Sequence, residues 1–266
     1  MYLKDKVAII TGGGTGIGEA TSLAFAKEGA VVVLASRNLA NLESVAENIR
    51  AQGGKAKAIQ TDISKLEQVQ NMVNLTIQEY GHIDILVNNG SALGGNNADV
   101  ADMDLENWHY TLAVSLTGTM YCSREVIRTM IPRKSGSIVN ISSVAGLSGV
   151  PSESPYAVAK WGVVGLTETM AIEAGKHNIR VNCVSPGATL TEDFKELMRQ
   201  IAEREGSSYE GLMNKIAYFN SLKRMAEPSE IADCVVFLAS DRSSAVTGHN
   251  LEASCGFHIT HPNEIP

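Results

Sequence analysis

The chain has 266 residues, of which 44% are hydrophobic and 19% are charged, and a formal net charge of −7. A chain of this length can bury one large core. The excess of acidic residues argues against a nucleic-acid-binding protein, because such a protein needs a stripe of basic side chains that displaces the counterions of the phosphate backbone. No apolar run is long enough to span a bilayer, and because residues 1–6 are charged we expect no signal peptide. The four cysteines show no metal-binding spacing, so we expect a cytoplasmic enzyme with reduced thiols and without a metal.

Short apolar, β-branched runs alternate with helical patterns along the chain. We predict strands near residues 7–11, 31–35, 57–61, 83–88, 136–141, 180–185 and 246–253, and helices near 17–28, 39–51, 66–80, 105–131, 155–175 and 228–239. This alternation predicts an α/β fold, in which residues 1–266 form a single Rossmann domain. A doubly wound, seven-stranded parallel sheet carries helices on both faces, with the ligand at the carboxyl ends of the strands.

The first predicted strand, residues 7–11, leads into a glycine-rich turn and then into a helical pattern. Glycines permit a tight turn, let a pyrophosphate approach without a Cβ in the way, and bring the helix close to the sheet. The helix N-terminus then faces the phosphates with unpaired N–H groups and the positive end of its dipole. We therefore predict a dinucleotide site that includes Gly12, Thr15, Gly16, Ile17 and Gly18.

The end of the second predicted strand indicates which cofactor is used. Ser36 and Arg37 stand where an NAD site usually carries a carboxylate for the ribose 2′-hydroxyl. A hydroxyl and a guanidinium suit the 2′-phosphate of NADP, so we expect NADP(H) rather than NAD(H). Alternatively, Arg37 is solvated and the enzyme uses NAD. After the third strand, Asp62 and Ile63 are expected at the adenine, although an aspartate there is also a common helix cap.

Ser143, Tyr156 and Lys160 form a pattern suited to proton transfer. The lysine follows the tyrosine by one helical turn and lies on the same helix face, where its charge favours the phenolate. Lowering the pKa of a tyrosine by about three units requires roughly 4 kcal/mol, which a partly dry site can supply and a solvated ion pair cannot. Since Tyr-x-x-x-Lys is also common on solvated helix faces, the pattern gains its specificity from the glycine turn.

Six motifs in this order and spacing resemble the short-chain dehydrogenase/reductase family over nearly the whole chain. They are residues 11–18 (TGGGTGIG), 62–63 (DI), 88–90 (NNG), Ser143, 156–160 (YAVAK) and 186–191 (PGATLT). The resemblance implies that Tyr156 is the general acid/base, that Ser143 binds the substrate oxygen, and that Lys160 holds the nicotinamide ribose and lowers the tyrosine pKa. It also implies further cofactor contacts, from Asn89, Pro186, Gly187, Thr189 and Thr191.

Three positions depart from the family pattern. Ser115 stands where most relatives carry an asparagine that bends its helix and holds a water of a proton relay. We place Ser115 among the catalytic residues, because its hydroxyl can bend a helix and hold a water, although with a shorter reach. Gly90-Ser91 replaces a usual Ala-Gly pair close to the nicotinamide and substrate. Residues 252–256 (EASCG) replace an Asp-Gly-Gly in a segment that lies at the subunit interface of relatives.

These patterns predict an NAD(P)-dependent oxidoreductase that interconverts a secondary alcohol and a ketone on a small, largely apolar substrate. Residues 189–227 break the strand–helix period, so we expect one or two helices that cap the substrate. An ordinary surface insertion is the alternative. The expected substrate contacts are Ser91, Leu93, Ser143, Leu147 and Tyr156. The candidate pocket lining is Ala92, Leu93, Leu147, Val150, Met198 and Met213.

Two other functions stay open. A 3-oxoacyl-[acyl-carrier-protein] reductase needs a basic patch for its acidic carrier, and Arg128, Arg133 and Lys134 cluster at the end of one predicted helix. A helix C-terminus favours such cations for its own reasons, however. Only Ser115 favours a non-catalytic dinucleotide-binding sensor or scaffold. The presence of Ser143, Tyr156 and Lys160 favours an enzyme. The family resemblance also implies a homo-oligomer, specifically a tetramer.

Overall fold

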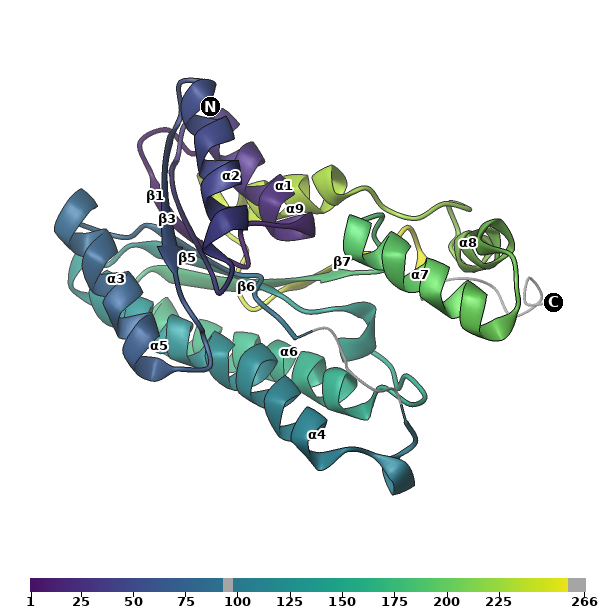
Figure 1. The fold of residues 1–266 in the computed structure, drawn as a ribbon. Coiled ribbons are helices and arrows are strands. Elements are labelled where there is room, and N and C mark those ends of the chain that lie inside the picture. The colour runs from purple at the N-terminus through teal and green to yellow at the C-terminus, as the bar shows by residue number, and fades with distance from the viewer. Residues whose placement is uncertain (93–97, 258–266) are drawn as a thin grey trace.

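The computed structural model describes residues 1–92 and 98–257 of the chain. In these residues seven parallel strands form one sheet with the order β3-β2-β1-β4-β5-β6-β7 (Figure 1). The strands are β1 (Val7–Thr11), β2 (Val31–Ser36), β3 (Lys55–Gln60), β4 (Ile85–Asn88), β5 (Gly136–Ile141), β6 (Ile179–Pro186) and β7 (Asn250–Ala253). The strand order reverses its direction between β1 and β4, which is the doubly wound arrangement. The predicted fold class is confirmed.

Helices cover both faces of the sheet (Figure 1). They are α1 (Gly16–Lys27), α2 (Leu39–Ala51), α3 (Leu66–Tyr80), α4 (Leu105–Leu112), α5 (Gly118–Met130), α6 (Ser154–Gly175), α7 (Glu192–Glu205), α8 (Tyr209–Tyr218) and α9 (Pro228–Ala239). Helices α1, α2 and α9 pack on one face, and α3, α5 and α6 pack on the other. Among the helices of the described part, none has both the length and the hydrophobicity that a bilayer crossing requires.

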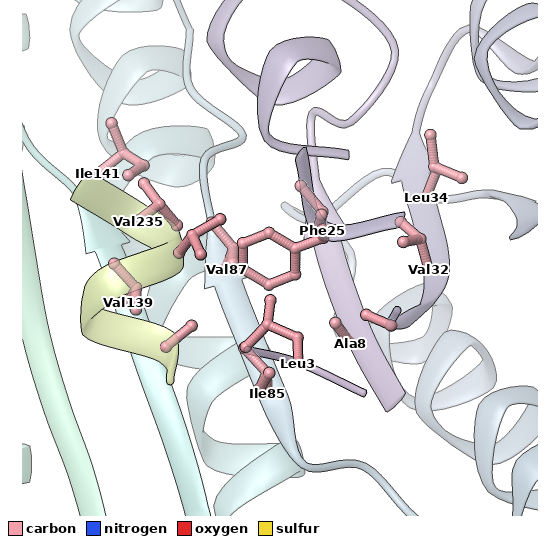
Figure 2. Close-up of a cluster of buried hydrophobic side chains, with 14 of the residues drawn as sticks. Leu3, Ala8, Phe25, Val32, Leu34, Ile85, Val87, Val139, Ile141 and Val235 are labelled. Carbon is pink, nitrogen blue, oxygen red and sulfur yellow. The ribbon is translucent and has the colours of Figure 1, made fainter. Parts of the chain in front are cut away.

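The sheet is buried on both faces, so its central strands are almost continuously apolar. Every residue of β1 is buried, as are the first five residues of β2. Such runs are typical of parallel strands covered by helices on both sides. Figure 2 shows one of the two cores, in which Phe25 of α1 lies among Leu3, Val87 and other apolar side chains. The packed sheet is a rigid platform for the polar residues that follow its strand ends.

The last strand is shorter than predicted, because β7 begins at Asn250 rather than near residue 246. The segment before it is a turn, in which Gly248 has a φ of +74° and its N–H donates to the carbonyl of Val181. Few residues other than glycine adopt that backbone conformation. The turn therefore delays the start of the strand.

The single helix predicted over residues 105–131 is interrupted. A π-helical turn, Ala113–Thr117, separates α4 from α5, and Ser115 lies at its centre. Thr119 donates its hydroxyl to the carbonyl of Ser115 (2.9 Å). Side-chain hydroxyls that bond to the helix backbone bend helices, and π-turns inside helices often occur at functional sites. The helical period of the sequence does not reveal this extra residue in the turn.

Residues 189–227 form two helices, α7 and α8, which lie at one side of the molecule beyond the sheet (Figure 1). The ends of this segment are joined, because Thr189 and Ala226 form a β-bridge and the N–H of Leu190 donates to the carbonyl of Ala226 (2.9 Å). A closed neck of this kind lets the two helices be attached to the sheet at one place.

Candidate active site

The residues predicted for the site converge at one edge of the sheet, beyond the carboxyl ends of the strands. Thr11 of β1 pairs with Asn88 of β4, which pairs with Asn140 of β5. The glycine turn, residues 89–91 and Ser143 therefore follow three adjacent strands at the same level. Since the strand order reverses between β1 and β4, their connections diverge and leave a crevice at this edge.

The glycine turn fits the pyrophosphate of a dinucleotide. Gly12 and Gly16 have φ values of +65° and +55°, which favour glycine, and a Cβ on Gly18 would lie 1.9 Å from the carbonyl oxygen of Gly12. The backbone of α1 is thus packed directly on the turn. Thr15 precedes α1 and makes no side-chain hydrogen bond to it, so its hydroxyl does not compete with a ligand for the first N–H groups. Ile17 is partly buried in the first turn.

Asn89 holds the glycine turn in place. Its side-chain Nδ2 donates to the carbonyl oxygens of Thr11 (3.1 Å) and Gly12 (3.2 Å). In return, the hydroxyl of Thr11 accepts from the N–H groups of Asn89 (3.1 Å) and Gly90 (2.9 Å). The segment after β4 and the glycine turn after β1 are therefore one hydrogen-bonded unit, which orients the site predicted for the phosphates.

The residues predicted for the adenosine end lie after β2 and β3. Asp62 accepts from the N–H (3.0 Å) and the hydroxyl (2.7 Å) of Ser64, so it stabilises the turn rather than capping α3, whose N-cap is Lys65. Ile63 is buried beside Gly90, because a Cβ placed on Gly90 would lie 2.9 Å from Cδ1 of Ile63. Ser36 is partly exposed, and its hydroxyl lies 3.4 Å from the carbonyl oxygen of Asn38.

The segment after β6 approaches the glycine turn from the other side. Thr191 caps α7 by accepting from the N–H of Phe194 (3.1 Å), and its Cγ2 would lie 3.1 Å from a Cβ on Gly16. Thr189 donates its hydroxyl to the carbonyl of Gly187 (3.0 Å). Pro186, the last residue of β6, is buried. These residues form the second wall of the crevice, opposite the turn.

Ser143 and Tyr156 come together as the sequence predicts. Ser143 caps a short turn after β5 by accepting the N–H of Ala145 (3.2 Å), and its hydroxyl also forms a hydrogen bond with Tyr156. Burial raises the pKa of Tyr156, while a hydrogen bond with Ser143 lowers it and the charge of Glu153 raises it. The net direction is upward, against the lowering expected from Lys160. Desolvation of the phenolate outweighs the favourable contacts in this structure.

Lys160 is almost fully buried on the same face of α6 as Tyr156. Its Nζ lies 5.4 Å from the centroid of the Tyr156 ring and donates to the carbonyl of Ile141 (2.9 Å). Burial lowers the pKa of Lys160 from 10.5 to about 8, and nearby Cys183 acts in the opposite direction. An ammonium has three N–H donors, so two stay available for a ligand such as the hydroxyls of a ribose.

This buried lysine predicts a pH-dependent stability. Between its folded pKa of about 8 and its unfolded value of 10.5, the unfolded state binds more protons, so the free energy of unfolding should rise with pH. Relative to Lys160→Met, the wild type should gain up to about 3 kcal/mol across this window. Urea unfolding of both proteins over that range measures the difference, and other titrating groups largely cancel in it. Parallel stability curves for the two proteins would contradict the assignment.

Two of the departures from the family pattern meet in the structure. The hydroxyl of Ser115 accepts the N–H of Ala92 (3.0 Å) and lies 3.0 Å from the hydroxyl of Ser91. Ser115 is 1% exposed. Its hydroxyl thus ties the π-turn to the segment after β4, next to the predicted nicotinamide site. The water relay through Ser115 stays a prediction.

This contact predicts that positions 91 and 115 are energetically coupled. Ser115→Asn places a larger side chain against Ser91 in a closed space and should cost about 1–3 kcal/mol of stability. Adding Ser91→Gly makes room for the amide, so the double variant should recover most of that loss. A double-mutant cycle by urea unfolding measures the coupling energy. Strictly additive effects would show that the two serines act independently.

The candidate pocket residues are only partly assembled. Ala92 and Met198 are buried, Leu147 and Val150 are partly exposed, and Leu93 lies outside the described residues. Met213 lies on α8, where it lines a cavity of about 430 Å³ together with Leu190 and Met225. The apolar residues of the predicted cap therefore face two places, the core and this cavity.

Two further residues contact the site, although no sequence motif includes them. Cys183 of β6 pairs with Asn140 of β5 and lies close to Lys160, whose charge lowers the thiol pKa while burial raises it to about 11. Cys183 is therefore a neutral thiol at pH 7. Tyr110 of α4 accepts a hydrogen bond from Arg37. Contacts over such separations give no signal in a single sequence.

Known proteins resemble this chain along nearly its whole length. A family model described as enoyl-(acyl carrier protein) reductase matches residues 12–258. The chain is 38% identical over 262 residues to the 3-oxoacyl-[acyl-carrier-protein] reductase FabG of Thermotoga maritima, covering 97% of this chain and 100% of that protein. It is 40% identical over 256 residues to a 2,5-dichloro-2,5-cyclohexadiene-1,4-diol dehydrogenase of Sphingobium indicum, covering 96% and 98%.

Solved structures agree with these relatives. The crystal structure of a variant of actinorhodin polyketide ketoreductase with NADPH superimposes with a TM-score of 0.91, at 30% identity, covering 96% of this chain and 98% of that one. The chain therefore belongs to the short-chain dehydrogenase/reductase family, whose members bind a nicotinamide dinucleotide, and it is an oxidoreductase of that family.

Proposed function

We propose that this protein interconverts a secondary alcohol and a ketone on a small, largely apolar substrate, with Tyr156 as the acid/base. The observation that carries the proposal is the grouping of Ser143, Tyr156 and Lys160 at the same sheet edge as the glycine turn. Ligands of open α/β sheets bind at this edge, and perturbed pKa values mark functional groups there.

Ser143, Tyr156 and Lys160 have different roles in the proposed reaction. When bound, the nicotinamide supplies or accepts the hydride. Tyr156 gives its proton to the ketone oxygen, and its raised pKa keeps it protonated at neutral pH, the form that reduction needs. Ser143, whose hydroxyl contacts Tyr156 in this structure, would donate its proton to the same oxygen when substrate is bound. Lys160 binds the ribose with the donors that Ile141 leaves available and supplies positive charge as the tyrosine ionises.

NADP(H) is the proposed cofactor. Ser36 and Arg37 supply a hydroxyl and a guanidinium at the end of β2, where a 2′-phosphate is recognised. The structural neighbour with NADPH supports this choice. The glycine turn would hold the pyrophosphate, and Gly187 with Thr189 and Thr191 would hold the nicotinamide end. If Arg37 only faces solvent, NAD(H) is the cofactor.

We propose that residues 189–227 cap the substrate within the one domain. Their closed neck at Thr189 and Ala226 joins them to the wall of the crevice, and helices on such a neck can order over a ligand. Ser91 and Leu147, with Leu93, would contact the substrate. The similarity to a cyclohexadiene-diol dehydrogenase favours an alicyclic alcohol or ketone.

Reduction of a 3-oxoacyl group on acyl carrier protein is the second candidate, supported by the similarity to FabG. The basic cluster near the end of α5 does not favour it. Arg133 pairs with Asp84 (2.9 Å), directly before β4, and therefore lies at the amino edge of the sheet, opposite the site. Arg128 lies 3.4 Å from Glu125. A carrier bound at this cluster would be at the wrong edge.

We also propose a cytoplasmic homotetramer. All four cysteines are free thiols, which suits a reducing compartment.

Helix α6 exposes Val158, Trp161 and Ile172, the last at 82%, and apolar side chains exposed along one helix are typical of an interface. Light scattering coupled to size-exclusion chromatography measures the mass in solution.

Initial rates with a panel of ketones test the proposed function. Cyclohexanone, acetophenone, acetoacetyl-CoA and acetoacetyl-acyl carrier protein are each supplied with NADPH or NADH, and loss of the reduced cofactor is followed by absorbance. We expect the highest kcat/KM with an alicyclic or aromatic ketone and NADPH. A preference for acetoacetyl-acyl carrier protein would establish the second candidate, and no turnover of any carbonyl would contradict both.

A further inference from the structure

Arg37 and Tyr110 meet across the crevice although 73 residues separate them. Arg37 follows β2 and Tyr110 lies on α4. Nη1 of Arg37 donates to the phenolic oxygen of Tyr110, and the guanidinium carbon lies 5.8 Å from the ring centroid. The backbone of Arg37 is held as well, because its carbonyl accepts from Nε2 of Gln60 (2.9 Å). The arginine is therefore oriented at both ends.

This partner leaves the charge of Arg37 uncompensated. A phenol is a neutral acceptor, and among the described residues no carboxylate forms an ion pair with Arg37. A guanidinium has five N–H donors in a planar fork, so the bond to Tyr110 leaves an edge available for a phosphate.

Carboxylates are nevertheless close. Arg37 lines a cavity of about 610 Å³ with Asp62 and Glu67, and with Gln60, Gln68 and Asn71. An arginine without another partner could turn toward these acidic groups and lose its attraction for an anion. The contact with Tyr110 gives the guanidinium a neutral partner on α4, and neither Asp62 nor Glu67 forms an ion pair with it.

We infer that Tyr110 is a positioning residue for cofactor discrimination: it holds Arg37 in the orientation that binds a 2′-phosphate. The inference rests on the proposed NADP(H) preference and extends it to a residue of α4. Since the side chain of an arginine has many rotamers, orienting it before the ligand binds removes part of the entropic penalty of binding.

The test uses the full-length protein and two ligands that differ only in the 2′-phosphate, 2′,5′-ADP and 5′-AMP, with affinities measured by calorimetry. Tyr110→Phe keeps the ring and removes the acceptor, and Tyr110→Leu removes both. We expect about threefold and about tenfold weaker binding of 2′,5′-ADP, respectively, with 5′-AMP changed by less than about twofold. Arg37→Ala should remove the preference entirely. His109→Ala, an exposed neighbour on α4, is the matched control and should change neither affinity.

The outcomes separate the inference from the function on which it rests. If the wild type binds both ligands equally, the proposed NADP(H) preference fails, and the inference fails with it. If Arg37→Ala loses the preference but both Tyr110 variants keep it, the preference stands and the role of Tyr110 is overturned. Equal losses for both ligands, or the same loss in His109→Ala, would mean that Tyr110 only supports α4, which also overturns the inference.

Discussion

Tyr156→Phe should lower kcat for ketone reduction by at least about 10²-fold while leaving the affinity for NADPH nearly unchanged. The substitution removes the transferable proton and keeps the ring, which lies 5.4 Å from Nζ of Lys160. The buried environment of α6 should therefore be preserved. Steady-state rates give kcat, and quenching of protein fluorescence gives the dissociation constant for NADPH.

Tyr2→Phe is the matched control, because Tyr2 is 52% exposed at the N-terminus and precedes β1 at the opposite edge of the sheet. It should keep the wild-type rate. If Tyr156→Phe retained more than a few per cent of the wild-type rate, another group would have to transfer the proton.

Ser143→Ala should lower kcat by about 10²-fold, as loss of a transition-state hydrogen bond does. A smaller effect on stability, about 1 kcal/mol, should accompany it, because the hydroxyl also accepts the N–H of Ala145. The variant also removes a contact that lowers the pKa of Tyr156, so that pKa should rise further. The alkaline limb of the pH–rate profile for reduction should then move to higher pH.

Ser143→Thr tests whether the hydroxyl itself is needed, since it keeps a hydroxyl for both the cap and the substrate. We expect it to retain more activity than Ser143→Ala and a pH profile close to that of the wild type. If both variants lost the same activity at an unchanged pH profile, the hydroxyl of Ser143 would not take part in the reaction.

The fold could be predicted from local patterns because a parallel sheet covered on both faces requires continuous apolar strands. The runs at residues 7–11 and 31–35 show this directly, and both are buried strands. Element ends were less predictable. The strand predicted from residue 246 begins at Asn250, since the turn at Gly248 depends on a hydrogen bond to Val181, a residue of another strand.

In the candidate site, too, some contacts could be predicted from the sequence and others could not. Ser143, Tyr156 and Lys160 lie within 18 consecutive residues, so motif spacing predicts their meeting, and the contacts among them follow it. The upward shift of the Tyr156 pKa could not be predicted from the motif, because burial depends on the whole fold. The contact between Ser91 and Ser115 joins two departures that look unrelated in the sequence.

Transfer of deuterium from the nicotinamide to a ketone tests directly whether the protein catalyses hydride transfer with Tyr156 as the proton donor. NADPH deuterated on both C4 positions is supplied with the most reactive ketone of the panel, and the alcohol is analysed by mass spectrometry and NMR. We expect one deuterium on the carbinol carbon with wild-type protein and at least about 10²-fold less alcohol with Tyr156→Phe. Alcohol without deuterium, or equal alcohol from the variant, would contradict hydride transfer assisted by Tyr156.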